Sequence, residues 1–316
     1  MREKTLKTVV TPKKRILNRH VKKYAFIASV WIYPTVLFAI FWVGVNFNSL
    51  LLAFQRWEDG RMVFAGFENF QKLFANIRDA GGLLLLSLKN TLLMFALCFI
   101  ISNPLYIIFS YYIYKKWPLA RIVRIIMLIP AIVSGFVICL VFLKFVEIGL
   151  PRMMLQITGK RFPQLISDPK YSFGTMIFYM IWISFTTSLI IYPNAMNAID
   201  KSIIESGQLD GVNNAQELWH IILPNMYAMI STTIVMGVAG LFAMSGPLIL
   251  FFKYSAPREV YNLGYYMFRE TMINTNDYTA YPYLASMGLV LTALSAPLTF
   301  TVKYFLDKYD PLGGAV

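Results

Sequence analysis

Long apolar stretches alternate with short polar segments along the whole chain. Six stretches each hold the roughly 20 predominantly apolar residues that an α-helix needs to cross a bilayer. They lie at residues 24–47, 83–106, 122–145, 173–196, 226–252 and 283–306. The pattern therefore predicts an all-α membrane protein with six transmembrane helices.

The composition agrees with this pattern. Apolar residues make up 57% of the 316 residues and charged residues only 14%, against about 45–50% and about 25% in soluble domains. The mean hydropathy is +0.57. These values exclude a disordered chain, a coiled coil and an ordinary soluble enzyme. No linker or repeat divides the chain, so we expect one membrane domain at 24–306, between a basic tail at 1–23 and a short tail at 307–316.

Positive charge gathers before the first apolar stretch, although the whole chain also carries a net charge of +13. Residues 1–23 hold nine Lys or Arg against the single acidic residue Glu3. The positive-inside rule places such a segment in the cytoplasm, where it also attracts anionic membrane lipid. Six crossings then return the C-terminus to the cytoplasm. A nucleic-acid-binding arm is the alternative, but no aromatic residues are interleaved to support it, and we expect no nucleic-acid partner.

Several chemistries have no candidate residues in the sequence. There is no GxxxxGK[ST] phosphate loop, no HExxH and no GxSxG. The two cysteines, Cys98 and Cys139, lie in apolar stretches, and the two histidines are far apart. No Asp or Glu falls within the six stretches, whereas ion-coupled carriers usually place such residues there. We therefore expect no enzyme activity, no metal site and no cofactor, and an energy source on a partner protein.

The segment 200–224, between the fourth and fifth stretches, has the most specific pattern. Ser202 and Glu205 have the spacing of a capping box at the start of a short helix, and Asn214 and Glu217 repeat it. Between them, Gly211 can adopt a positive φ and form a turn. The second helix has an apolar side made of Leu218, Trp219, Ile221 and Ile222. Two amphipathic helices of this kind are suited to docking in a groove of another protein.

This segment resembles the EAA loop of the permeases of binding-protein-dependent ABC importers. The positions that match in order and spacing are Glu205, Asp210, Gly211, Trp219, Ile221, Leu223 and Pro224. The departures are Ser206 and Gly207 in place of two alanines, and Val212 in place of a third. Glycine at 207 is expected to weaken the first helix by about 1 kcal/mol relative to alanine.

Two further segments resemble the carbohydrate branch of these permeases, which includes the maltose permease pair. One is residues 66–70, similar to a Gly-Leu-x-Asn-Tyr/Phe segment, and the other runs from Arg124 to Pro130. Residues 244–247 read Met-Ser-Gly-Pro, where that branch has Thr-x-Gly-Gly-Pro. The departure concerns sugar specificity more than fold.

The resemblance implies a type I ABC importer permease (MetI-like) fold in the bacterial inner membrane. It also implies an identical or different second permease, two ABC ATPase subunits and an extracytoplasmic solute-binding protein. The residues expected to couple to the ATPase are Glu205, Gly207, Asp210, Gly211 and Trp219. The alternative is that they are only caps and a turn, as in any cytoplasmic loop.

The resemblance also implies that the helices before and after this loop contact the solute. The positions carried over are Ser184, Thr187, Gly237 and Leu241. For the hydroxyl residues the alternative is bonding to carbonyls of their own helix. For Gly237 and Gly240 the alternative is close packing between helices.

Two other functions remain open at this point. The same fold could import a different solute, such as a peptide, a polyol or an oligosaccharide fragment. The protein could also be a membrane scaffold that recruits an ATPase without transport. ATPase stimulation by a solute in a reconstituted complex distinguishes transport from scaffolding.

Overall fold

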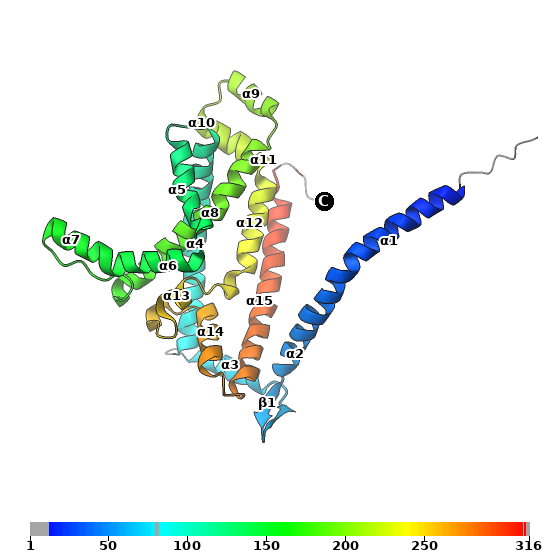
Figure 1. Ribbon diagram of the computed structural model, residues 1–316, viewed down its shortest axis with the longest axis vertical. Helices are drawn as coiled ribbons and strands as arrows, with labels where there is room; N and C mark the ends of the chain where they lie inside the picture. Colours follow the sequence, from blue (N-terminus) through cyan, green and yellow to red (C-terminus); the bar gives the residue numbers. More distant parts are fainter. Residues whose placement is uncertain (1–12, 80–81, 312, 314–316) are drawn as a thin grey trace, which may run out of the picture.

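The structure is a computed structural model that describes residues 13–79, 82–311 and 313, with side chains from residue 21 onward. Helices account for nearly all regular elements of this described part, as the sequence predicts (Figure 1). Its one sheet is an antiparallel hairpin of β1 (Gln55–Glu58) and β2 (Arg61–Phe64). The hairpin lies at one end of the molecule, beside the helices that close that end (Figure 1).

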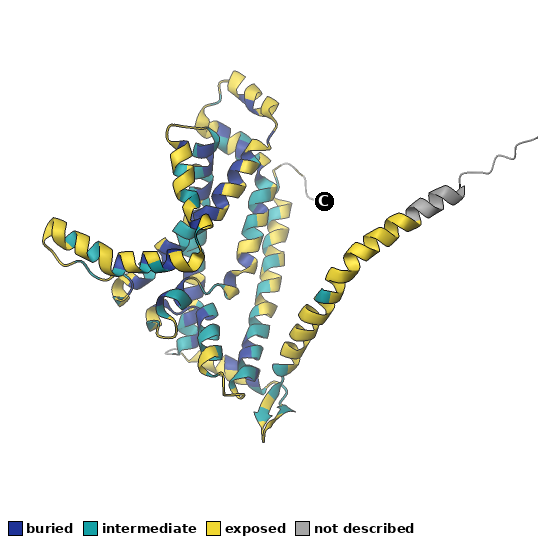
Figure 2. Ribbon diagram, viewed as in Figure 1, coloured by how far each residue is buried: buried dark blue, intermediate teal, exposed yellow. Residues whose placement is uncertain are grey.

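The first apolar stretch forms a long helix that projects away from the rest of the molecule (Figure 1). It comprises α1 (Lys13–Leu37), a π-helical segment η1 (Phe38–Val43) and α2 (Gly44–Leu52). From residue 21 onward its side chains are almost all exposed (Figure 2), which an apolar helix tolerates only in lipid or against another protein. Helix α1 begins at Lys13, so residues 13–23 of the predicted tail are helical and continuous with the first apolar stretch; residues 1–12 lie outside the described part.

Three long helices form the centre of the bundle: α4 (Leu83–Tyr114), α8 (Pro169–Asn197) and α15 (Ala280–Lys308). Helices α4 and α8 pack along each other, and α12 (Tyr227–Ala239) packs along α15. One apolar core holds α4 and α8 together through Tyr106, Phe185, Leu189 and Tyr192. The predicted end of the second stretch, residue 106, is too early, because α4 continues for two more turns to Tyr114.

The third predicted span, 122–145, is not one straight helix. Helix α5 (Ala120–Ile132) ends at an extended Val133, and α6 (Gly135–Lys144) continues after a bend of 108°. Pro130 in the last turn of α5 cannot donate a backbone hydrogen bond, which weakens the helix just before the bend. Beyond α6 the chain continues through η2 (Phe145–Gly149) and α7 (Leu150–Thr158).

The fifth predicted span, 226–252, is also wrong as a continuous helix. Helix α12 ends at Ala239, and η4 (Leu241–Ala243) and α13 (Leu248–Phe252) follow as short separate pieces. Gly246 lies between them at φ +58°, a conformation that favours glycine and interrupts a helix. A different bent pair, residues 214–225 with α12, turns by 70°. The described chain thus has four straight candidate spans, or up to six if each bent pair is one span.

Short elements close both ends of the bundle. At the hairpin end lie α3 (Glu68–Arg78), η5 (Arg258–Val260) and α14 (Leu263–Ile273). There the buried Asn69 donates to the carbonyls of Ala53 and Gln55 at 3.0 and 2.7 Å, so it joins α3 to β1. At the opposite end lie α9 (Lys201–Leu209), α10 (Asn214–Gln216), the π-helical η3 (Glu217–Ile222) and α11 (Leu223–Asn225).

Candidate functional site

The segment 200–225 caps one end of the bundle, and α9 is its first helix (Figure 1). Asp200 is the N-cap of α9, where its carboxylate accepts a hydrogen bond from the backbone N–H of Ser202 at 3.0 Å. That bond holds the pKa of Asp200 below its ordinary value. The predicted capping box of Ser202 and Glu205 is therefore wrong, because Asp200 already caps the helix. Glu205 is left exposed to solvent.

A glycine turn ends α9. The backbone N–H of Val212 donates to the carbonyl of Gly207, and that of Gly211 to the carbonyl of Gln208, both at 3.1 Å. These two bonds make a Schellman motif, in which the residue after the C-cap is left-handed. Gly211 occupies that place at φ +78°. The sequence-based expectation of a turn with positive φ at Gly211 agrees with the structure.

Gly207 is buried where α9 contacts η3. A Cβ atom at this position would overlap Cδ1 of Ile221. The glycine therefore allows the two helices to approach closely, besides weakening α9. Ile204 on the same helix and Ile222 on η3 are buried in the apolar core formed with α4 and α8.

The second helix begins one residue earlier than its predicted capping box. Asn213 and Gln216 form the box: each side chain accepts from the other residue's backbone N–H at 2.9 Å. The predicted pair of Asn214 and Glu217 is therefore wrong by one position. The shift frees the carboxylate of Glu217 for other contacts.

Glu217 is buried, with 2% of its side chain exposed. Both of its carboxylate oxygens lie 3.0 Å from Nζ of Lys115, which follows α4. Tyr111 on α4 and Gln208 on α9 also donate to the carboxylate, at 3.2 and 3.3 Å. The group thus connects the segment to the central bundle. This role of Glu217 could not be predicted from the sequence, because Lys115 lies about a hundred positions away and no local pattern indicates the contact.

The outward side of the segment carries the other predicted coupling residues. Glu205 and Asp210 are exposed, and Trp219 is 65% exposed. Ile203 and Leu209 on α9 are exposed as well. The predicted apolar side of the second helix is therefore divided, with Ile222 in the core and Trp219 at the surface. Exposed large apolar groups beside carboxylates are typical of a surface that contacts a partner.

A second candidate feature is a cavity of about 240 Å³ between α4, α8 and α12. Two of the four predicted solute positions, Ser184 and Gly237, line it. The other two do not, since Thr187 is exposed on the outer side of α8 and Leu241 is buried elsewhere. The remaining lining residues are Phe95, Cys98, Phe99, Ser102, Asn103, Tyr106, Met180, Thr233 and Met244. Most of these lie on α4, which the sequence analysis did not consider because it adjoins neither end of the loop.

The hydroxyl groups of α8 are largely occupied within the protein. Ser184 donates to the carbonyl of Ile181 at 2.6 Å and accepts from Tyr106, and Ser188 donates to the carbonyl of Ser184 at 3.2 Å. The back-bonding alternative thus fits both serines. For Gly237 the close-packing alternative fits less well, because the nearest atom to an added Cβ would be in Phe99, 4.0 Å away.

Taken together, several long apolar helices define a multi-pass membrane protein, and an amphipathic helical segment closes one end of its bundle. The family described as "Binding-protein-dependent transport system inner membrane component" matches residues 108–312, well over half of the chain. The chain belongs to this family. The matched range includes α8, the whole segment 200–225 and α12.

Curated relatives match along almost the whole chain at low identity. Protein LplB of Bacillus subtilis (strain 168) is 22% identical over 90% of this chain and 90% of its own length. The polygalacturonan/rhamnogalacturonan transport system permease protein YteP of the same organism is 22% identical over 95% of this chain and 93% of its own. The arabinooligosaccharides transport system permease protein AraP of Halalkalibacterium halodurans is 21% identical over 96% of this chain and 98% of its own length. The resemblance to sugar-type permeases found in the sequence is confirmed.

Solved structures confirm the fold. A chain of a bacterial ABC transporter involved in the import of the acidic polysaccharide alginate superposes with a TM-score of 0.76 at 18% identity. The match covers 93% of this chain and 99% of that one. The alginate transporter in complex with its alginate pentasaccharide-bound periplasmic protein gives a TM-score of 0.73, also at 18% identity, covering 92% and 95%. The predicted ABC importer permease fold is therefore correct.

Proposed function

We propose that this protein is a permease subunit of an ATP-driven importer of carbohydrates in a bacterial cytoplasmic membrane. It forms the translocation path with a second permease and works with two ABC ATPase subunits and an extracytoplasmic solute-binding protein. Membership of the family and the docking geometry of segment 200–225 support this proposal most directly. Relatives whose names specify polygalacturonan, rhamnogalacturonan or arabinooligosaccharides favour a sugar over a peptide.

Segment 200–225 is the proposed coupling loop. Glu205, Asp210 and Trp219 face outward and would contact the ATPase, whereas Gly207 and Gly211 fix the angle between its two helices. Movement of the loop would reach the bundle by two routes, through Glu217 to α4 and through α11 to α12. In this proposal the loop faces the cytoplasm, together with the end of α15 that lies at the same end of the bundle (Figure 1).

The cavity between α4, α8 and α12 is the proposed part of the solute path within this chain. Ser184 and Gly237 remain in the proposal, together with Asn103 and Ser102 on α4. Amide and hydroxyl groups of this kind recognise the hydroxyls of a sugar, and the aromatic Phe95 and Tyr106 supply apolar surface for its ring faces. Thr187 and Leu241 have no place in this wall.

The coupling role is tested with two substitutions in the loop. Gly211→Val forces a β-branched residue into a left-handed conformation, and Glu205→Lys reverses a charge on the docking surface. One matched control is Gly159→Val, at the C-cap of α7, where the glycine has φ +67° and equally open surroundings. The other is Asp307→Lys, near the same end of the bundle. The measurements are retention of the ATPase during purification of the complex and uptake of the solute in cells.

We expect both loop variants to reach the membrane in normal amounts and to lose ATPase retention and uptake. Central interface residues often contribute about 2 kcal/mol or more, which corresponds to a loss of retention of at least about tenfold. The controls should keep both properties. Normal uptake and ATPase retention in both loop variants would contradict the docking assignment.

The scaffold alternative makes a different prediction. In a reconstituted complex with the solute-binding protein, a transporter shows ATPase activity that rises when the solute is added. A scaffold shows the same activity with and without solute.

A further inference from the structure

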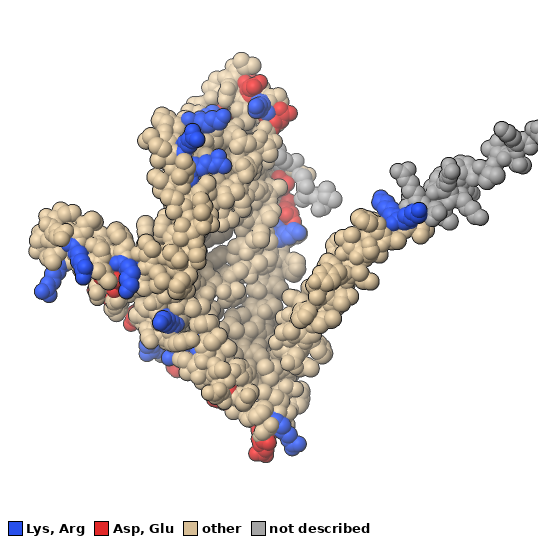
Figure 3. Space-filling view, viewed as in Figure 1, with Lys and Arg blue, Asp and Glu red and all other residues tan. Residues whose placement is uncertain are grey.

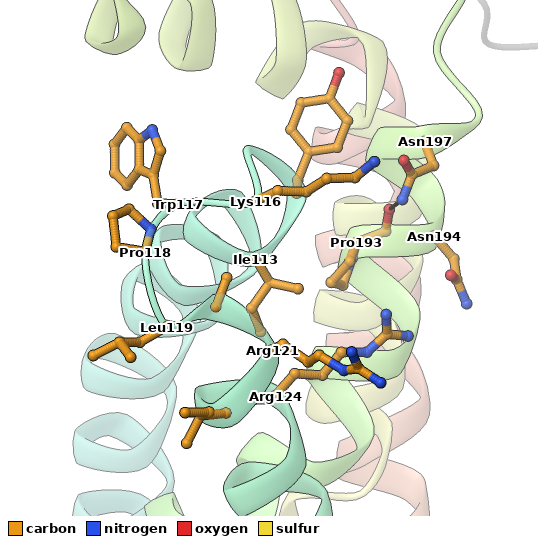
Figure 4. A pocket seen from close by; sticks show the side chains of 13 residues that line it. Ile113, Lys116, Trp117, Pro118, Leu119, Arg121, Arg124, Pro193, Asn194 and Asn197 are labelled. Atoms are coloured by element: carbon orange, nitrogen blue, oxygen red, sulfur yellow. Dashed lines mark hydrogen bonds between the residues drawn. The ribbon is translucent and has the colours of Figure 1, made fainter.

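A groove of about 700 Å³ lies at the loop end of the bundle, separate from both features described above. One wall is the turn after α4 and the first turns of α5, from Lys116 to Arg124. The opposite wall is the last turn of α8, with Pro193, Asn194 and Asn197 (Figure 4).

The groove is strongly basic. Lys116, Arg121 and Arg124 line it, and no Asp or Glu does. None of the three side chains has an ion pair or hydrogen bond with another residue in the described part of the chain. The two arginines extend side by side from α5 toward α8 (Figure 4). In Figure 3, basic side chains gather over α5 and the turn before it, and the acidic side chains at this end lie to one side, over α9. Two unpaired guanidinium groups side by side are stabilised by an anion, and they match the geometry of a phosphate. The ammonium group of Lys116 lies beside Asn197, further along the groove (Figure 4).

The depth of the groove is that of a membrane interface. Tyr114 and Asn197, which line it, are the last residues of the apolar helices α4 and α8. Trp117 forms part of the same wall. Tyr and Trp are enriched where apolar helices leave the bilayer, at the level of the lipid headgroups.

An exposed apolar stripe continues from the basic mouth along α5. It consists of Ile122, Ile125, Ile126 and Ile129, which recur at helical spacing on one face and are 46–57% exposed. A ligand that fits both parts has an anionic phosphate at one end and hydrocarbon chains at the other. A free phosphate would leave the stripe unused.

We propose that this groove binds the headgroup of an anionic phospholipid, with its phosphate at Arg121 and Arg124, Lys116 adding positive charge to the same groove, and its acyl chains along the isoleucine stripe of α5. Basic pockets between transmembrane helices are suited to anionic headgroups. The turn that forms the groove also carries Lys115, which pairs with Glu217 of the coupling loop. A bound lipid would therefore restrain the turn that holds the loop. The inference depends on the chain crossing a membrane and not on the proposed solute.

The test uses the full-length protein, purified in mild detergent, depleted of lipid and titrated with phosphatidylglycerol or phosphatidylcholine under native mass spectrometry. The variant R121Q/R124Q removes two charges from the groove. The control R152Q/R161Q removes two exposed charges on α7 and the loop beyond it. We expect the groove variant to bind phosphatidylglycerol about tenfold more weakly, the control to match the wild type, and phosphatidylcholine to bind weakly to all three.

A second measurement does not depend on the double variant folding. Brominated phosphatidylglycerol should quench the fluorescence of Trp117 in the wild-type protein. The Trp117 signal is the difference between the fluorescence of the wild type and that of W117F. Brominated phosphatidylcholine at the same concentration should quench this signal less. Equal affinity for phosphatidylglycerol in the groove variant and the wild type would overturn the proposal. Displacement of the lipid by millimolar inorganic phosphate would also overturn it, because the site would then bind a soluble anion.

Discussion

The single residue that best explains how the loop is fixed to the bundle is Glu217. A buried carboxylate is unfavourable unless its charge is paired and its oxygens are hydrogen-bonded. Here Lys115, whose side chain is 18% exposed, supplies the charge, and Tyr111 and Gln208 supply further donors. Removing either partner leaves the other charge in a poorly solvated site.

We predict that Glu217→Gln weakens the anchoring of the coupling loop. Breaking a buried ion pair by removing one partner destabilises by about 3–5 kcal/mol, and the lower value applies here because Lys115 keeps some contact with water. The measurement is hydrogen–deuterium exchange of residues 201–225, which should speed up by about a hundredfold or more. The double variant Lys115→Met with Glu217→Met removes both charges and should recover most of the protection. Equal exchange in the single and double variants would show that the pair does not hold the loop.

A second residue-level prediction concerns Gly264 at the start of α14. A Cβ atom there would lie 2.8 Å from the backbone carbon and oxygen of Met244, and backbone atoms cannot rotate away. We expect Gly264→Ala to destabilise by about 1–3 kcal/mol, measured as thermal unfolding in detergent. Gly174→Ala in α8 is the control, because nothing lies within 4 Å of its added Cβ; it should be neutral or stabilising by up to about 1 kcal/mol.

At the scale of elements, the contact between α9 and η3 explains a departure from the family pattern. The resembling permeases have alanine where this chain has Gly207, and alanine is the better helix former. In this chain the long side chain of Ile221 occupies the space that an alanine methyl would need. The size of the side chain that fits at position 207 therefore depends on the side chain at position 221.

We predict coupling between substitutions at these two positions. Gly207→Ala alone should give little or no gain in stability, because Cδ1 of Ile221 must move. Ile221→Val removes that methyl group, so in its background Gly207→Ala should stabilise by about 1 kcal/mol through helix propensity. A double-mutant cycle on loop opening should give an interaction of at least about 0.5 kcal/mol. Additive effects of the two changes would contradict direct packing of α9 on η3.

At the scale of the whole molecule, the apolar stretches and the family could be predicted from the sequence, but the paths and breaks of the helices could not. Length and hydropathy locate the apolar stretches, because every helix in lipid must hide its backbone and show apolar side chains. Length and hydropathy do not show where a helix bends or in which direction it continues. The bend after Ile132 and the break after Ala239 depend on which neighbours satisfy the released backbone groups, and these come from distant parts of the chain.

In the candidate site, too, features set by local sequence could be predicted, whereas features set by contacts between distant helices could not. Gly211 was predictable because a turn with positive φ depends on local backbone conformation. Glu217, Asn103 and Tyr106 were not, because their roles depend on contacts between helices far apart in sequence. Thr187 does not line the cavity for a related reason: the hydroxyl residues of α8 do not reveal from sequence alone which side of the helix faces the cavity.

The whole protein is predicted to depend on partners for energy. The purified chain in liposomes should hydrolyse no ATP and move no solute, because the sequence offers no phosphate-binding loop and no acidic residue within its predicted spans. Addition of the ATPase subunits, the second permease and the solute-binding protein should produce both activities. Uptake driven by a proton gradient through this chain alone would contradict the prediction.

The outlying helix of α1, η1 and α2 has a consequence for biogenesis. Its backbone hydrogen bonds are internal, and its apolar window has no buried residues, so its stability in lipid requires nothing from the bundle. Synthesis proceeds from the N-terminal side, and this helix therefore enters the bilayer before the bundle helices exist. It can therefore set the orientation of the nascent chain on its own. The bent helices that follow cannot remain in lipid without neighbours to cover their breaks. They are inserted into a membrane in which the direction of the chain is already fixed.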